Sequence, residues 1–397
     1  MTKPTLFDQF ERTDGAPCRH QEDSFAFRNR VDQPYWDRVR AELEKWYAAY
    51  PDEPPYPLRT RFRKRKEAQH FGAWWELYLH HLFECLGFEV EVEPEVGTGK
   101  PDFRMIRDSK SFLLEATTSS SGIVDEDRRP EQEAAILDAI NKVRNTDFYL
   151  SLSIERVGTQ QPSVRSIVNP IEQWLDGLDP DAETAESERT LVITPHGWEL
   201  HFGATALSAE GRGMADHRPL GIGPMTVGYV NDRQRLAGAL QRKRSSYQPD
   251  EPLVIAVLTR SSGTMDLEDV ESALLGPVVY PIDPEGRGLG ERYRQRGGFW
   301  MRSDGPTSTR VSAVLTANNL VPETVARVWP RLWPNPWAAR PLEHDLPFPV
   351  GAASQQGAFE YTEADSGPNV LLGLPADWPG PERQEFSKPW STHPEPS

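Results

Sequence analysis

The stretch PDFRMIRDSKSFLLEAT, residues 101–117, decides the fold that the sequence predicts. Residues 102–107 and 110–117 are predicted as two strands, and only Asp108 and Ser109 separate them, which is typical of a very short turn. If these two residues form the turn, Asp102 lies directly opposite Glu115 on the neighbouring strand. The sequence therefore predicts two carboxylates side by side on one face of a hairpin.

This pair of carboxylates points to a metal site. Opposite residues in a hairpin have β-carbons about 5 Å apart, and two carboxylates at that separation repel each other unless a positive charge lies between them. A hard divalent cation with oxygen ligands is the usual solution. We therefore expect Asp102 and Glu115 to bind Mg²⁺ or Mn²⁺; the alternative is a charged edge strand exposed to solvent.

The elements around the hairpin predict an α/β fold. Apolar residues recur at helical spacing over residues 66–86, and Gly87 follows as a helix-ending residue. Trp74 and Trp75 in this helix are expected in the core rather than as platforms for stacked bases. Further helices are predicted at residues 35–50, 134–144 and 234–247, and further strands at 88–93, 148–157, 191–194, 198–207, 253–258 and 311–317.

The order of these pieces resembles the PD-(D/E)xK, or restriction-endonuclease-like, nuclease superfamily. Its pattern is a helix with a glutamate, a strand that opens with Pro-Asp, and a next strand that carries Glu-x-Lys. The matching residues are Glu76 on the helix, Pro101-Asp102, and Glu115 followed two residues later by Thr117. The resemblance implies a mixed central sheet flanked by helices, and Asp102, Glu115 and Glu76 as metal-binding catalytic residues. It covers residues 66–118 most clearly and extends to about residue 260.

Thr117 stands where the superfamily pattern has lysine, so the lysine must come from elsewhere. That lysine steadies negative charge on the phosphate during hydrolysis. Lys243 is the favoured replacement, because Lys243 and Tyr247 share a face of the predicted helix and resemble the Gln-x-x-x-Tyr helix of nucleases related to RecB. Lys100 is the rival, because the hairpin register puts it opposite Thr117.

The net charge of −16 argues against binding nucleic acid through overall charge, so local basic patches would have to contact phosphates. Two runs qualify, residues 59–66 and residues 233–244. The alternative is that both are ordinary solvated faces. The two runs flank the predicted site in the sequence, and we expect them to flank the substrate.

The sequence suggests a cytoplasmic protein. Its two cysteines, Cys18 and Cys85, can build neither a disulfide framework nor a cysteine zinc cluster. The longest apolar runs are too short to cross a bilayer, and the first residues lack the apolar stretch of a signal peptide.

Four regions are expected along the chain. Residues 1–60 form a helical arm with a proline-rich connector, and residues 61–260 form the nuclease-like core with insertions. Residues 261–380 form a C-terminal extension, and the proline-rich and charged residues 381–397 form a disordered tail.

The predicted function is hydrolysis of phosphodiester bonds in DNA, with a role in bacterial defence or DNA processing suggested by analogy of fold. Two alternatives remain open at this stage. One is a catalytically inactive member of the same fold that binds nucleic acid or acts as a scaffold, which Thr117 permits. The other is an RNA-directed nuclease. A homo-oligomer, or a protein partner bound through the C-terminal region, is compatible with each of these functions.

Overall fold

The computed structural model describes residues 3–16, 18–19, 22–97, 99–119, 129–145, 147–158, 160–182, 189–207, 212, 232–243, 250–260, 265–279 and 293–381. Its contacts divide the chain into two compact units. The main unit comprises Met1–Pro17, Asp23–Ser121 and Val230–Ser397. The inserted unit comprises Cys18–Glu22 and Gly122–Tyr229.

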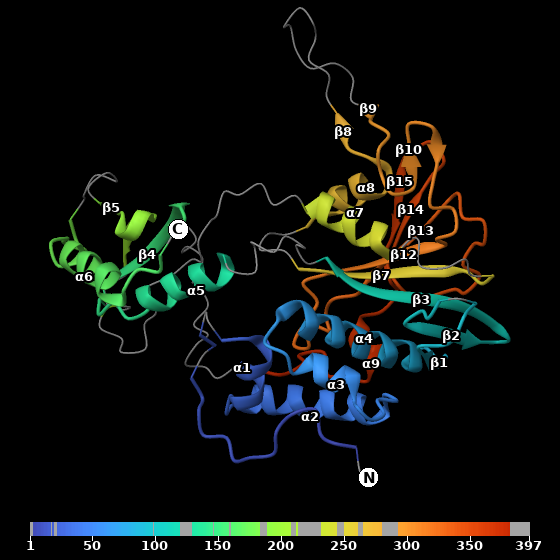
Figure 1. Ribbon diagram of the computed structural model, residues 1–397, viewed down its shortest axis with the longest axis horizontal. Coiled ribbons are helices and arrows are strands. Elements are labelled where there is room, and N and C mark those ends of the chain that lie inside the picture. Colours follow the sequence, from blue (N-terminus) through green and yellow to red (C-terminus); the bar gives the residue numbers. More distant parts are fainter. Residues whose placement is uncertain are drawn as a thin grey trace, which may run out of the picture. The chain divides into compact units, whose positions relative to one another are not determined.

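A mixed sheet of eight described strands forms the centre of the main unit (Figure 1). Its order is β1-β2-β3-β7-β12-β13-β14-β15. The three central strands β3, β7 and β12 are parallel, and β1 and β2 join β3 as an antiparallel meander. The strands are β1 Glu89–Val92, β2 Phe103–Arg107, β3 Lys110–Ser119, β7 Leu253–Thr259, β12 Ala313–Asn318, β13 Arg331–Pro334, β14 Val350–Ala353 and β15 Phe359–Thr362. The expected α/β class, with a mixed sheet flanked by helices, is confirmed.

Helix α4, Glu67–Cys85, packs on one face of this sheet and matches the helix predicted over residues 66–86. Trp74 and Trp75 are fully buried within it, and their indole N–H groups donate to the carbonyls of Leu320 and Ala256 at 3.1 and 3.0 Å. Because a buried indole needs a hydrogen-bond acceptor, these contacts fix both rings in the core, as predicted. The helices that pack around α4 are α1 Ser24–Arg30, α2 Pro34–Ala49, α3 Pro57–Phe62 and α9 Pro368–Leu372.

Helices α7, Asp232–Lys243, and α8, Leu267–Leu275, cover the opposite face of the sheet, as Figure 1 shows. Strand β7 lies between the two helical layers, and all of its residues are buried. This explains why β7 is a continuous apolar run rather than an alternating one. Among the described helices, none combines the length and the apolarity that crossing a membrane requires.

The β2–β3 hairpin has the predicted register. Arg107 pairs with Lys110, and the pairing continues to Phe103 opposite Leu114. Asp108 and Ser109 both have positive φ, 52° and 60°, which is the signature of a two-residue type I′ turn. This turn matches the right-handed twist of the strands, and one further step along the register puts Asp102 opposite Glu115.

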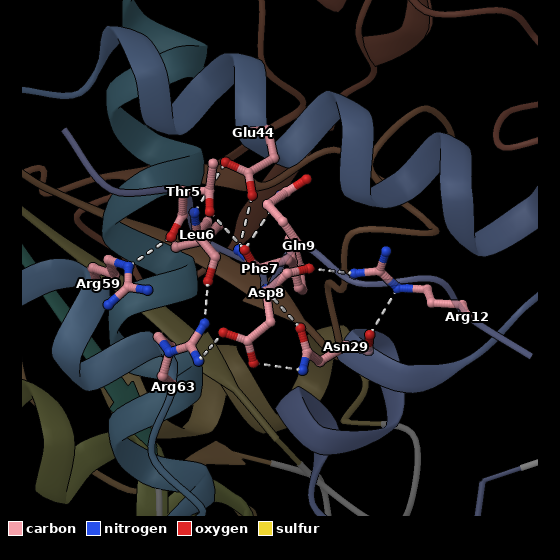
Figure 2. Close-up of polar contacts among 10 residues, drawn as sticks. All are labelled: Thr5, Leu6, Phe7, Asp8, Gln9, Arg12, Asn29, Glu44, Arg59 and Arg63. Atoms are coloured by element: carbon pink, nitrogen blue, oxygen red, sulfur yellow. Dashed lines mark hydrogen bonds and ion pairs between the residues drawn. The ribbon is translucent and has the colours of Figure 1, made fainter. Parts of the chain in front are cut away.

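Residues near the N-terminus are held against the first helices rather than extending as a separate arm (Figure 2). The Glu44 carboxylate accepts hydrogen bonds from the backbone N–H groups of Leu6 and Phe7. Arg59 donates to the carbonyl of Thr5, and Arg63 donates to the carbonyl of Leu6. Phe7 is 1% exposed and belongs to the same apolar cluster as α4.

The expected boundaries at residues 60 and 260 both fall inside the main unit. The region 261–380 extends the central sheet, since β12 pairs in parallel with β7 and β13 pairs with β12. These pairings join strands far apart in the sequence, which periodicity alone does not reveal. The expected tail, residues 381–397, lies outside the described residues except for residue 381.

The inserted unit has its own sheet and its own core. Its described strands pair antiparallel in the order β4-β6-β5. Its apolar cluster draws only on residues between Ile136 and Ala206. The elements are α5 Arg129–Ile140, β4 Phe148–Arg156, α6 Val164–Leu175, β5 Thr190–Ile193, the 3-10 turn η2 Pro195–Gly197 and β6 Glu199–Ala206.

Four short strands complete the described main unit as two-stranded ribbons. They are β8 Val278–Val279 with β9 Tyr293–Arg294, and β10 Met301–Arg302 with β11 Gly305–Pro306.

Candidate active site

The site begins where β3 runs on beyond its antiparallel partner. The pairing of β2 with β3 stops at Phe103 opposite Leu114, so β3 continues from Glu115 with that edge free of β2. Asp102, immediately before β2, fills the first position of this edge with its side chain. Its Oδ2 accepts a hydrogen bond of 2.7 Å from the backbone N–H of Ala116. The carboxylate is thereby fixed against the strand that carries Glu115.

Glu115 lies on the face of β3 that α7 covers. Leu113, two residues earlier on the same face, is in one apolar cluster with Leu236 and Leu240 of α7. The Glu115 side chain is only 4% exposed, which is unusual for a carboxylate and requires a positive partner.

Lys243, the last residue of α7, is that partner. Its Nζ donates to Glu115 Oε2 at 2.6 Å and to Asp102 Oδ2 at 3.0 Å. The buried residues Leu236 and Leu240 hold α7 on the sheet, and Lys243 follows Leu240 at the spacing that keeps it on the same side of the helix. The structure thus brings together Asp102, Glu115 and Lys243, three of the four predicted site residues.

The charges of these three residues depend on each other. Burial, followed by the negative charge of Asp102, raises the pKa of Glu115 to about 7, although Lys243 acts in the opposite direction. Burial alone would lower the pKa of Lys243, but Asp102 and Glu115 outweigh it and raise that pKa above its ordinary value. Lys243 therefore stays a cation at neutral pH, whereas burial and the charge of Asp102 oppose the ionisation of Glu115.

Glu76, the fourth predicted residue, binds Arg61 rather than Lys243. Its two carboxylate oxygens accept hydrogen bonds from the two terminal nitrogens of Arg61 on α3, at 2.5 and 2.6 Å. Burial raises the pKa of Glu76 above its ordinary value and outweighs the opposite effect of Arg61. The charge of Asp102 also raises this pKa, and the charge of Lys243 lowers it. Glu76 is therefore within electrostatic reach of the trio, while its hydrogen bonds go to Arg61.

Lys100, the rival to Lys243, is turned to another partner. It forms an ion pair of 3.0 Å with Glu93, and both side chains are more than half exposed. Thr117 pairs with Val257 of the neighbouring strand β7. Tyr247, the expected companion of Lys243, lies outside the described residues.

Three arginines of the first basic run make contacts inside the fold. Arg59 and Arg63 bind backbone carbonyls near the N-terminus, and Arg63 also pairs with Asp8 (Figure 2). Arg61 alone among these three is directed to the predicted site, through Glu76. Lys64, Arg65 and Lys66 are exposed, so the expectation that this run flanks a substrate stays a prediction. In the second run, Arg242 is exposed and Arg244 lies outside the described residues.

Sequence reasoning missed Arg61 as a site residue. It was seen only as one member of the basic run, because helical spacing within α3 does not show which arginine faces α4. One feature of the sequence could have pointed to Arg61. Glu76 belongs to a helix rich in apolar residues, and a carboxylate that is buried there needs a cation as its partner.

The donor set of this site suits a small divalent cation. One carboxylate oxygen of Asp102 and one of Glu115 contact the same cation, the Lys243 ammonium. The two carboxylates therefore already share a positive charge. Mg²⁺ is usually bound by one or two carboxylates together with water and substrate oxygens, which matches a pair rather than a full protein cage. Within the described ranges, no group of three or more His, Cys, Asp or Glu side chains is arranged to hold a metal.

Comparison of the chain with protein-family models, with curated proteins and with solved structures found no match. The function proposed below is therefore inferred from the geometry of the site itself.

Proposed function

We propose that this protein is a metal-dependent phosphodiesterase of the PD-(D/E)xK type that cleaves DNA. Asp102 and Glu115 would hold Mg²⁺ or Mn²⁺, and Lys243 would take the role of the motif lysine that Thr117 leaves vacant. The observation that carries the proposal is the pair of hydrogen bonds from Lys243 to both carboxylates. Two carboxylates and a lysine at one strand edge are the group that this chemistry requires.

The position of Lys243 supports a catalytic role rather than a purely structural one. The side chains of Lys243 and Asp102 are each about one quarter exposed, so both residues reach solvent. The Glu115 side chain, in contrast, is buried. A structural ion pair needs no accessible cation, whereas contact with a phosphate does.

The residues divide the work of hydrolysis between them. A bound divalent ion would act as a Lewis acid and lower the pKa of a water molecule. The Asp102 carboxylate is oriented by the N–H of Ala116, and the Glu115 carboxylate is oriented by a hydrogen bond from Lys243. Lys243 Nζ is a hydrogen-bond donor that would steady the negative charge on the phosphate while water attacks in line and the bond to the leaving oxygen breaks.

The test is cleavage of single- and double-stranded DNA and RNA by the full chain in Mg²⁺, Mn²⁺ or EDTA, with Asp102→Asn and Glu115→Gln as variants. We expect cleavage of DNA only with metal, and a loss of roughly 100-fold or more in each variant. Binding without cleavage in every metal would favour the inactive scaffold. Cleavage restricted to RNA would favour the RNA-directed enzyme, and cleavage that survives both substitutions would exclude this site.

A further inference from the structure

The Arg61–Glu76 ion pair joins α3 to α4 beside the proposed site. Glu76 is the buried member, with a side chain 13% exposed, while the Arg61 side chain is 37% exposed. Both oxygens of Glu76 are engaged by Arg61, so the carboxylate sets the plane and direction of the guanidinium. The pair thus consists of a buried anchor and a cation that reaches solvent.

Arg61 keeps donors that Glu76 does not use. A guanidinium has five N–H donors in a fixed fork, and the two hydrogen bonds to Glu76 involve one N–H on each terminal nitrogen. Within the described part of the chain, the remaining donors have no acceptor. A planar donor group of this kind matches the oxygens of a phosphate.

Arg61 and Glu76 are within electrostatic range of the proposed catalytic trio. The hydrogen bonds that Arg61 donates to Glu76 are the main cause that raises the pKa of Arg61, and the charge of Asp102 adds to the effect. Glu76 in turn feels both Asp102 and Lys243. Arg61 therefore faces the same group of charges as Lys243, from the opposite helical layer of the sheet.

The neighbours of Arg61 in the chain provide a contrast. Arg59 and Arg63 lie two residues to either side, and their guanidinium groups hold the backbone near the N-terminus (Figure 2). Arg63 also lies over the ring of Phe25 and pairs with Asp8. Their structural roles account for them without a ligand, whereas the exposed donors of Arg61 are not explained by the fold.

We propose that Arg61 binds a backbone phosphate of the nucleic-acid substrate, and that Glu76 positions Arg61 rather than holding the metal. This inference rests on the proposed function. In this arrangement Arg61 on α3 and Lys243 on α7 contact the substrate from the two helical layers that cover the sheet. Arg61 is a binding residue, and Glu76 acts only through it.

The first test measures binding without metal, so that cleavage cannot interfere. The full chain is titrated in EDTA with a short fluorescein-labelled DNA, single-stranded or duplex, over a series of KCl concentrations. Arg61→Gln should weaken binding by about tenfold. It should also lower the slope of log affinity against log salt by about 0.9 for duplex DNA, the value for one phosphate contact. Arg61→Lys should retain the slope, because the slope depends on charge.

Stability must be separated from binding, because Arg61→Gln leaves the buried carboxylate of Glu76 unpaired. The double variant Arg61→Gln/Glu76→Gln removes both charges and should recover thermal stability, yet it should keep the reduced salt slope. Arg63→Gln is the matched control from the same segment and should keep the native slope. If the Arg61→Gln slope equals the native slope, Arg61 is structural and the inference is wrong, while the proposed function stands.

The role of Glu76 is tested by titrating Mn²⁺ into the protein and recording the heat of binding. Glu115→Gln should abolish binding, whereas Glu76→Gln should retain most of the affinity. Equal losses in the two variants would make Glu76 a ligand and overturn its positioning role. If the native chain binds neither DNA nor RNA with or without Mg²⁺, the proposed function itself fails.

Discussion

At the scale of single residues, the site depends on one lysine from a distant part of the chain. Lys243 contacts two carboxylates that would otherwise repel each other, one of them almost completely buried. Thr117 is thus no evidence against activity, because an ammonium reaches the same carboxylates from α7 instead of from position 117 of β3. A lysine on a helix and a lysine on the strand can serve the same phosphate if their Nζ atoms meet at the same place.

We predict that Lys243→Gln lowers the rate of metal-dependent cleavage by about 100- to 1000-fold, the usual cost of removing one donor to developing negative charge. Lys100→Gln is the control. It breaks an exposed ion pair of small energetic value and should leave the rate within about twofold of native. Single-turnover cleavage of labelled DNA measures both. The reverse ranking of the two variants would assign the role to Lys100.

A second prediction concerns the stability that Glu115 contributes at different pH. Its pKa is about 7 in the folded protein and 4.5 as its ordinary value, so the folded state binds the proton more tightly than the unfolded state. The contribution of Glu115 to stability must therefore fall as pH rises between these values. Against Glu115→Gln, the native free energy of unfolding should decline by up to about 3 kcal/mol across this range.

Urea unfolding of both proteins in EDTA, at several pH values from 4.5 to 8, measures this difference. Comparing the two proteins cancels the contributions of His70, His80 and His81, whose pKa values burial lowers and which act in the opposite direction; for His70 the pKa falls to about 3. A difference that stays constant with pH would show that Glu115 ionises as in solvent.

At the scale of secondary-structure elements, the β2–β3 hairpin determines which residues face each other. A slip of one residue would move Glu115 from the α7 face of β3 to the opposite face, away from Lys243. The two-residue turn prevents such a slip, because its length sets the register. The strained residues of this turn, Asp108 and Ser109, are therefore the local cause of the carboxylate pair.

We predict that Ser109→Gly stabilises the protein by about 0.5–1 kcal/mol, since a non-glycine residue at φ of 60° carries a conformational penalty that glycine avoids. Cleavage should be unchanged, because the turn lies at the end of the hairpin farthest from Asp102. Equilibrium unfolding in urea measures the change. A loss of stability would show that the Ser109 side chain makes contacts that outweigh the strain.

At the scale of the whole molecule, the inserted unit interrupts the main unit between β3 and α7. Glu115 therefore precedes the inserted unit in the chain, and Lys243 follows it. The described residues of the inserted unit have a separate apolar cluster, and no member of that cluster belongs to the two clusters of the main unit. The main unit can thus form its sheet without contributions from the inserted core.

We predict that replacing residues 122–229 by a flexible Gly-Ser linker leaves a folded main unit that keeps metal-dependent cleavage. Calorimetry of the native chain should show two unfolding transitions, and the shortened chain should show one. The shortened chain carrying Glu115→Gln controls for contaminating nuclease. An insoluble or unfolded product would indicate that the two units depend on each other for stability.

The sequence by itself determined the features that depend on neighbouring residues. Counting back from a two-residue turn sufficed to place Asp102 opposite Glu115, and helical periodicity sufficed for α4. Only the tertiary structure decided which lysine meets the pair, which arginine binds Glu76, and that β12–β15 belong to the central sheet. The reason is physical: turn and strand geometry act over a few residues. The parallel pairing of β3 with β7 and the packing of α7, in contrast, join segments more than a hundred residues apart.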